Sequence, residues 1–289
     1  MTSWLDDALR LFGRLIVLAL FALLAFFVSG IVLKPVFPDG VPAGPEGMLL
    51  FGFLGAVALL VAHVAVVLIF ERGRWEVVGM GAHAWRPMPI LLGAVAGILV
   101  IIIPSALLLA TNQAHFETMP AGSWGSAALD AMLWLAAPAL FEELIARGYV
   151  LGTIAKTWGE PAAITLTSLG FGLLHLGNPG ATAWSVGAVV IAGVFLASVR
   201  LGTGSLAAAW LAHLGVNWAQ GAIMHAPISG LTFLPTPNYR LVSEGPAWLT
   251  GGEWGLEAGA VTAATVLLVT FLFFLSRRGA SNRTMSRLG

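Results

Sequence analysis

The stretch Leu15-Ile-Val-Leu-Ala-Leu-Phe-Ala-Leu-Leu-Ala-Phe-Phe-Val-Ser-Gly-Ile-Val-Leu33 contains 19 consecutive residues without a charge. A helix of about 20 apolar residues is long enough to cross the hydrocarbon core of a bilayer. The run is longer than the apolar core of a signal peptide, and no A-x-A cleavage pattern follows it. We therefore interpret it as an uncleaved first transmembrane helix, preceded by an interfacial stretch at Trp4–Phe12.

The whole chain of 289 residues has the same apolar character. Hydrophobic residues make up 58% of it and charged residues 10%, whereas an ordinary soluble domain is about 25% charged. The net charge is zero, which gives no indication of a nucleic-acid partner. The absence of cysteine excludes disulfides, cysteine nucleophiles and thiolate metal sites. These properties predict a polytopic membrane protein, with the lipid bilayer as its main surroundings.

Apolar segments of membrane-spanning length recur along the chain, and we predict eight transmembrane helices. They lie at about residues 12–33, 48–70, 88–110, 125–155, 161–176, 183–200, 204–225 and 256–275. No internal repeat is visible, so we expect one all-α membrane domain over residues 1–289.

The basic residues indicate how these helices are oriented. With eight spans both termini lie on the same side, and most Lys and Arg residues fall on that side: Arg10, Arg14, Arg72, Arg74, Arg86, Lys156, Arg200, Arg277, Arg278, Arg283 and Arg287. Only Lys34 and Arg240 fall on the other side. Because cytoplasmic loops are rich in Lys and Arg, we predict that both termini are cytoplasmic. The Ala-, Gly- and Leu-rich, lysine-poor composition favours the inner membrane of a bacterium.

The fourth predicted helix carries three charges within six residues, in Pro138-Ala-Leu-Phe-Glu142-Glu143-Leu-Ile-Ala-Arg147-Gly148. A charge inside a span costs at least about 2.5–3.5 kcal/mol, which makes these residues functional candidates. Glu143 and Arg147 are four residues apart in the order that favours an ion pair. Glu142 lies about 140° around the helix from Arg147. We therefore predict a structural Glu143–Arg147 clamp and a Glu142 that is free for chemistry.

Further polar residues lie at similar depth in two other predicted helices. Counting 1.5 Å per residue from the cytoplasmic helix ends places Glu142, His175 and Asn217 about 20 Å deep and His213 about 14 Å deep. His213 and Asn217 are four residues apart and so share a helix face. We predict that these four side chains form one site.

The remaining histidines and the glycine pairs have simpler interpretations. His63 is expected to make a helix–helix hydrogen bond, whereas His83, His115 and His225 are expected at the surface. Gly93–Gly97 is expected to be a close-packing site between helices.

At these positions the sequence resembles the CPBP family of intramembrane proteases (CAAX protease and bacteriocin-processing, also called Abi). The family's motifs are E-E-x-x-x-R, F-x-x-x-H and H-x-x-x-N, in that order. Here they stand as Glu142-Glu143…Arg147, Phe171…His175 and His213…Asn217. The resemblance covers about residues 125–225, the expected catalytic core. It implies an eight-helix, all-α protease whose active-site cavity opens towards the cytoplasm.

The resemblance also implies a role for each motif residue. Glu142 and His175 would activate the hydrolytic water, His213 and Asn217 would form the oxyanion hole, and the Glu143–Arg147 clamp would hold the cavity in shape. This implies an endopeptidase of the glutamic type that needs no metal or other cofactor. Its substrate would be a peptide or protein that enters from the membrane or the cytoplasmic side.

Two other interpretations stay open at this point. Glu142, His175 and His213 could form a two-His, one-carboxylate zinc site, which would make the protein a zinc-dependent metallopeptidase. The same cavity could also belong to a non-catalytic membrane scaffold or immunity protein. A proton-coupled transporter has less support, because no repeated half with broken helices is visible.

Overall fold

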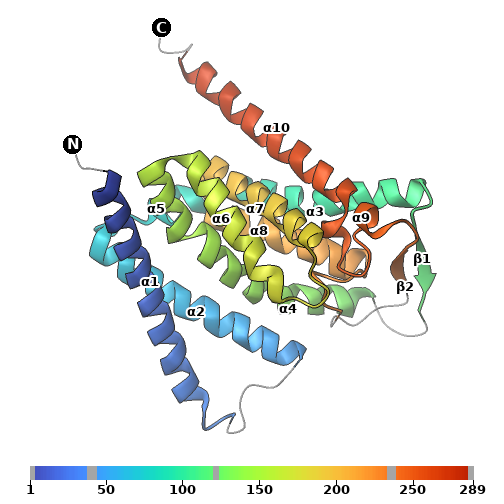
Figure 1. The fold of residues 1–289 in the computed structure, drawn as a ribbon, viewed down its shortest axis with the longest axis horizontal. Coiled ribbons are helices and arrows are strands. Elements are labelled where there is room, and N and C mark those ends of the chain that lie inside the picture. The colour runs from blue at the N-terminus through green and yellow to red at the C-terminus, as the bar shows by residue number, and fades with distance from the viewer. Residues whose placement is uncertain (1–3, 38–43, 120–123, 233–238, 286–289) are drawn as a thin grey trace.

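A computed structural model describes residues 4–37, 44–119, 124–232 and 239–285 of the chain (Figure 1). The uncharged run at Leu15–Leu33 is the second part of a single helix, α1 (Trp4–Leu33). The predicted interfacial stretch Trp4–Phe12 is therefore the first part of the same helix and not a separate element. Its charged residues Asp6, Asp7 and Arg10 do not interrupt it, since each tolerates helical geometry near a helix start.

The described residues form a mostly helical bundle. After α1, the helices are α2 (Pro45–Phe70), α3 (Pro87–Ala110), α4 (Trp124–Arg147), α5 (Tyr149–Trp158), α6 (Glu160–Leu174), α7 (Ala183–Thr203), α8 (Leu206–Trp218), α9 (Ala247–Thr250) and α10 (Ala260–Met285). Short 3₁₀ turns are η1 (Trp75–Val77), η2 (Ala82–Trp85), η3 (His175–Gly177) and η5 (Leu256–Ala258), and η4 (Ala219–Ile223) is a π-helical turn.

Four helices in the described ranges are long and apolar enough to cross a membrane: Trp4–Leu33, Glu46–Phe70, Pro87–Ala110 and Ala183–Thr203. A fifth apolar stretch, Ala260–Phe274, is shorter. The other helices of the bundle carry the polar residues of the motifs or are shorter than a full span. The count of eight spans and the side on which the termini lie stay predictions.

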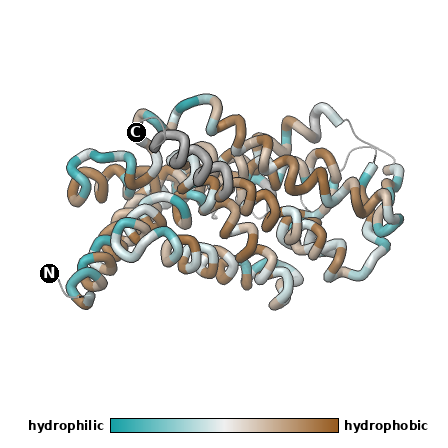
Figure 2. The backbone as a smooth tube through the Cα atoms, turned by 90° about the horizontal axis from the view of Figure 1, so that it is seen from above, coloured by the Kyte–Doolittle hydropathy of each residue, from teal (hydrophilic) through white to brown (hydrophobic). Residues whose placement is uncertain are grey.

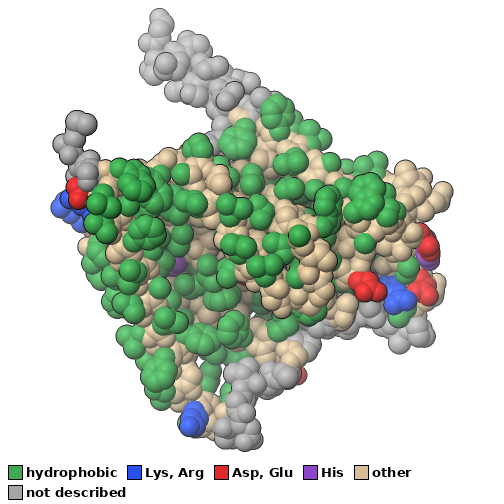
Figure 3. All heavy atoms as spheres, in the orientation of Figure 1, with side chains coloured by type: hydrophobic (Ala, Val, Ile, Leu, Met, Phe, Trp, Pro, Cys, Tyr) green, Lys and Arg blue, Asp and Glu red, His purple; other side chains and the backbone are tan. Residues whose placement is uncertain are grey.

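The outer surface of the bundle is that of a protein surrounded by lipid. On α1, large side chains such as Leu20, Leu23 and Phe27 are more than half exposed. Figure 2 shows hydrophobic residues along the middle of the helices and hydrophilic ones mainly at their ends and turns. Figure 3 shows hydrophobic side chains over the middle of one face and charged ones at its margins. A soluble monomer rarely exposes so large an apolar surface, so the described surface fits a bilayer.

Helix α8 lies in the interior, where it packs against α3, α4 and α7. The close approach of α3 depends on two glycines, because a Cβ on Gly93 or Gly97 would overlap the backbone carbonyl of Ala208 or Ala212. The predicted close-packing role of Gly93–Gly97 is confirmed. Small residues at this contact let the two backbones approach each other, as is common between membrane helices.

The prediction of one continuous fourth helix over residues 125–155 is wrong, because the chain breaks at Gly148 between α4 and α5. His63 of α2 stabilises the break. Its Nε2 accepts the backbone N–H of Tyr149 at 3.0 Å, and its Nδ1 donates to the carbonyl of Leu59 at 2.7 Å. The side chain thus satisfies one of the free N–H groups at the start of α5. A Cβ at Gly148 would overlap the His63 ring. The helix–helix role predicted for His63 is confirmed.

Two short strands were not predicted. β1 (Ala114–Thr118) and β2 (Tyr239–Ser243) pair antiparallel, with Phe116 opposite Leu241. They come from distant parts of the chain, and only Ala114 and Leu241 are buried in them. The alternation of apolar and polar residues in Ala114-His-Phe-Glu-Thr118 is the sequence signal that could have indicated β1.

Candidate active site

The last two turns of α4 hold the buried ion pair that the sequence predicts. The Nη1 of Arg147 donates to the Oε1 of Glu143 at 3.0 Å, and both side chains are fully buried. The Nη2 of Arg147 also donates to the backbone carbonyl of Gly193 in α7 at 3.1 Å. The clamp therefore joins α4 to α7, in addition to pairing two residues of the same helix.

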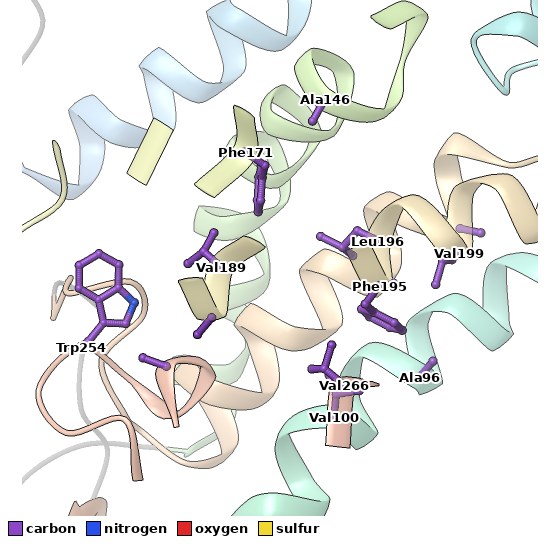
Figure 4. Close-up of a cluster of buried hydrophobic side chains, with 14 residues drawn as sticks. Ala96, Val100, Ala146, Phe171, Val189, Phe195, Leu196, Val199, Trp254 and Val266 are labelled. Atoms are coloured by element: carbon purple, nitrogen blue, oxygen red, sulfur yellow. The ribbon is translucent and has the colours of Figure 1, made fainter. Parts of the chain in front are cut away.

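Phe171 of α6 lies at the centre of the site. The guanidinium of Arg147 lies over its ring, 4.1 Å from the centroid. The ring also contacts the imidazoles of His175 and His213 edge-on, with centroids 4.8 and 5.8 Å away. Its backbone carbonyl accepts a hydrogen bond from the Nδ1 of His175 at 2.8 Å. The Phe of the F-x-x-x-H motif thus contacts three polar side chains at once and orients them. Figure 4 shows Phe171 within the buried hydrophobic cluster that borders the site.

Glu143 has a second partner that the sequence did not indicate. The Nδ1 of His213 in α8 donates to the same Oε1 of Glu143 at 3.0 Å. Because the carboxylate also faces Arg147, it acts as an acceptor, so the proton is assigned to Nδ1 of His213. The two residues are 70 positions apart, and nothing in their local sequence links them. Glu143 therefore orients His213 as well as closing the clamp.

Glu142 faces both imidazoles. Its Oε2 lies 3.9 Å from the Nε2 of His175 and 3.8 Å from the Nε2 of His213. These separations are too long for direct hydrogen bonds, and this oxygen has no hydrogen-bond partner among the described residues. The side chain is one-third exposed (33%). As the helical angles predict, Glu142 is separate from the clamp and lies beside the two histidines.

A small cavity of about 40 Å³ lies next to these imidazoles. Its polar lining comes from His175, His213, Asn217, Ser229, Glu257 and Thr262. The space suffices for about one water molecule. Asn217 and His213 share the face of α8 that lines the cavity, as their spacing predicts. Glu142 does not line it, but the two imidazoles face both Glu142 and the cavity.

Ser229 and Glu257 are polar cavity residues from outside the motifs. Ser229 follows the π-helical turn η4, and Glu257 lies in η5, immediately before α10. The predicted helix 256–275 is wrong at its start, because α10 begins at Ala260 and Glu257 lies in a turn that folds back to the cavity. Burial raises the pKa of Glu257 to about 7. A single acidic residue next to a predicted span end is typical of a membrane interface, so no sequence pattern indicates that Glu257 reaches the cavity.

The histidines outside the motifs differ from expectation in one case. His83 and His115 are exposed, as predicted. His225 is buried (7% exposed), so the prediction of a surface position is wrong. Its ring packs against Tyr239, with centroids 4.7 Å apart, because the chain folds back after η4. Burial lowers the pKa of His225.

No group of three or more His, Asp or Glu side chains in the described ranges is arranged so that it could hold a metal ion. Zinc binding by Glu142, His175 and His213 would therefore require these side chains to move.

In a comparison with known protein families, residues 124–219 match the family model described as Type II CAAX prenyl endopeptidase Rce1-like. The matched segment runs from the start of α4 to the first residue of η4 and contains all three motifs. No curated protein and no solved structure matches significantly. The resemblance noted from the motifs is thereby confirmed for this segment.

Proposed function

From the premise that residues 124–219 are of the CAAX-protease type, we propose that the protein is an intramembrane endopeptidase that hydrolyses a peptide bond with a water activated by Glu142 and His175. The observation that carries the proposal is the convergence of Glu142 Oε2 with the Nε2 atoms of His175 and His213, at 3.9 and 3.8 Å. Ionisable groups inside an apolar bundle are costly, and functional sites are where they are retained.

The first step is the attack of water on the substrate carbonyl. The Nδ1 of His175 is engaged with the Phe171 carbonyl, so the neutral ring presents its Nε2 lone pair towards Glu142. A water that contacts both Nε2 and the Glu142 carboxylate is held for proton transfer. Glu142 takes one proton while the water oxygen bonds to the carbonyl carbon, and the electron pair of the C=O double bond moves to its oxygen. This is general base catalysis by a carboxylate.

The negative oxygen formed in this step requires hydrogen-bond donors. His213 and Asn217, which share one wall of the cavity, supply them in this proposal. Since Nδ1 of His213 donates to Glu143, a second donation from Nε2 requires the ring to be an imidazolium. The intermediate then collapses as the C–N bond breaks, and the amine leaves with the proton that Glu142 had taken.

A zinc mechanism would use the same three side chains, but they would first have to rearrange, because no group of three among the described residues could hold a metal ion as it stands. The metal-free mechanism and the zinc mechanism differ in their response to chelation. We expect the activity of purified protein to survive exhaustive treatment with a strong zinc chelator. Loss of activity on chelation and its return with Zn²⁺ would establish the zinc mechanism instead.

The proposed arrangement in the membrane has eight spans, cytoplasmic termini and a site that opens towards the cytoplasm of a bacterium. Its support is the distribution of charge. Arg14 and Lys156, predicted on the same side, both bind the buried Glu71, at 2.9 and 3.0 Å. Arg240, predicted on the opposite side, pairs with Glu117 across strands β1 and β2, at 2.7 Å. The side chains of Arg277, Arg278 and Arg283, and the whole of Arg287, lie outside the described residues.

The proposal is tested with purified protein in liposomes and a panel of C-terminal peptides, with and without a prenyl group. We expect cleavage of at least one peptide by the wild type and none by the Glu142→Gln variant. Cleavage by Glu142→Gln at the wild-type rate would refute the role of Glu142. A protein that cleaves nothing, yet keeps its biological effect when Glu142 is replaced, would be a scaffold.

A further inference from the structure

We propose that Glu257 is a positioning residue that fixes the ends of α6 and α8 relative to each other, and so sets the separation of His175 from Asn217. The expected effect of Glu257 on turnover rests on the proposed function, whereas its effect on the positions of the ends of α6 and α8 does not. Glu257 lies outside the family match and outside all three motifs.

One side of Glu257 is bound to the end of α8. Gln220 lies in η4, three residues after Asn217, and is almost fully buried (1% exposed). Its Nε2 donates to Oε2 of Glu257, and its Oε1 accepts the backbone N–H of Glu257 at 3.1 Å. The two residues therefore bind each other in both directions, which fixes the turn that follows Asn217.

The other side of Glu257 is bound to the end of α6 through two intermediates. Oε1 of Glu257 accepts hydrogen bonds from the backbone N–H and the Oγ of Ser229. The carbonyl of Ser229 accepts from Nδ2 of Asn178 at 3.0 Å. The backbone N–H of Asn178 donates to the carbonyl of His175 at 3.1 Å. A continuous chain of hydrogen bonds thus runs from Glu257 to the backbone of His175.

Glu257 is itself held in a rigid setting. The carbonyl of Ala258 accepts a hydrogen bond from Trp184 of α7 at 2.8 Å, and the carbonyl of Trp254 accepts one from Gly230 at 2.7 Å. Gly255 has a φ of +128°, and a Cβ there would overlap both the Glu257 carboxylate and the Gln220 amide. Only glycine fits at this position, which indicates how closely the cluster is packed.

The carboxylate suits this task because its two oxygens serve two different segments. Oε1 binds the Ser229 turn and Oε2 binds Gln220, so one side chain connects both ends. An amide at position 257 could retain the Ser229 contacts but would present N–H groups to the Gln220 amide. Alanine would lose both contacts. The cavity has room for about one water, and a misplacement of about 1 Å in such a site can cost on the order of 10²-fold in rate.

The structural part is tested by a distance measurement, for which the absence of native cysteine is an advantage. Spin labels are attached to the variants Leu176→Cys, in η3, and Ile223→Cys, in η4, and the distance distribution is measured by pulsed electron paramagnetic resonance. We expect Glu257→Ala to broaden or shift the distribution. Glu253→Ala, an exposed residue of the same loop, is the matched control and should leave it unchanged. A folded Glu257→Ala with the wild-type distribution would overturn the proposal.

The activity measurement separates this inference from the proposed function. If the wild type cleaves a peptide and Glu142→Gln does not, Glu257→Ala should lower kcat by about 10- to 100-fold with little change in KM. Glu257→Gln should recover part of the loss. A wild-type kcat in Glu257→Ala would overturn this inference and leave the proposed function standing. If the wild type cleaves nothing, the proposed function fails, and the distance measurement still tests whether Glu257 positions the two helix ends. Should Glu257→Ala not fold, Glu257→Gln takes its place in both experiments.

Discussion

Replacing Arg147 by alanine tests the buried clamp. The substitution removes the 3.0 Å ion pair with Glu143, the hydrogen bond to the Gly193 carbonyl and the cation–π contact with Phe171. Glu143 would stay fully buried, with His213 as its remaining partner. Breaking one side of a buried ion pair costs about 3–5 kcal/mol, because the other charge is left without compensation.

The expected result is a drop in thermal stability of on the order of 10 °C in detergent, from that free energy and the usual dependence of Tm on stability in larger domains. Arg86→Ala, at an exposed arginine, is the control and should stay within about 1–2 °C of the wild type, because exposed substitutions change stability by less than about 0.5 kcal/mol. The double variant Glu143→Leu/Arg147→Leu should be more stable than Arg147→Ala, since it leaves no unpaired charge. A well-folded Arg147→Ala with unchanged Tm and full activity would refute the reasoning.

Three further predictions concern the cavity and its surroundings. Asn217→Ala should lower kcat by roughly 10²–10³-fold with little change in KM; an equal loss in substrate binding would mean that Asn217 is not an oxyanion donor. The pKa of Glu257 is raised to about 7 in the folded protein, against about 4.3 in an unfolded chain. The contribution of this group to stability is therefore fully present below about pH 4 and is lost as the pH rises towards 7. Thermal unfolding from pH 4.5 to 7 should therefore show a decline in the wild type that is absent in Glu257→Gln, by about 1.4 kcal/mol per pH unit, and superimposable profiles would contradict it. Gly97→Ala should lower Tm because the added methyl meets the Ala212 carbonyl, whereas Gly187→Ala, in open space, should not; equal Tm values for both would argue against close packing of α3 on α8.

The parts of the site that follow from helix geometry could be predicted from the sequence. The spacing of Glu143 and Arg147 determines their pairing, and the same geometry separates Glu142 from them. Helix rise places His175 at the depth of Glu142 and His213 about one turn away, and the structure has both imidazoles within 3.9 Å of Glu142. These features depend on short-range periodicity and on the thickness of a bilayer. Both can be inferred from the sequence without knowledge of tertiary contacts.

The parts that depend on contacts between distant segments could not be predicted. The break at Gly148 depends on His63, which lies in another helix. The second partner of Glu143 is His213, 70 residues away. Glu257 reaches the cavity only because a turn precedes α10 and folds back. No local pattern encodes these contacts, and each of them is made after the helices have packed.

The central claim, that Glu142 serves in peptide-bond hydrolysis inside the membrane, is tested most directly by peptide profiling. Membranes of cells that express the wild type, Glu142→Gln or the exposed-residue control Glu253→Gln are compared by mass spectrometry of released and retained peptides. The account predicts defined cleavage products with the wild type and with Glu253→Gln, and their absence with Glu142→Gln at equal expression. The same products in the same amounts from Glu142→Gln would contradict it.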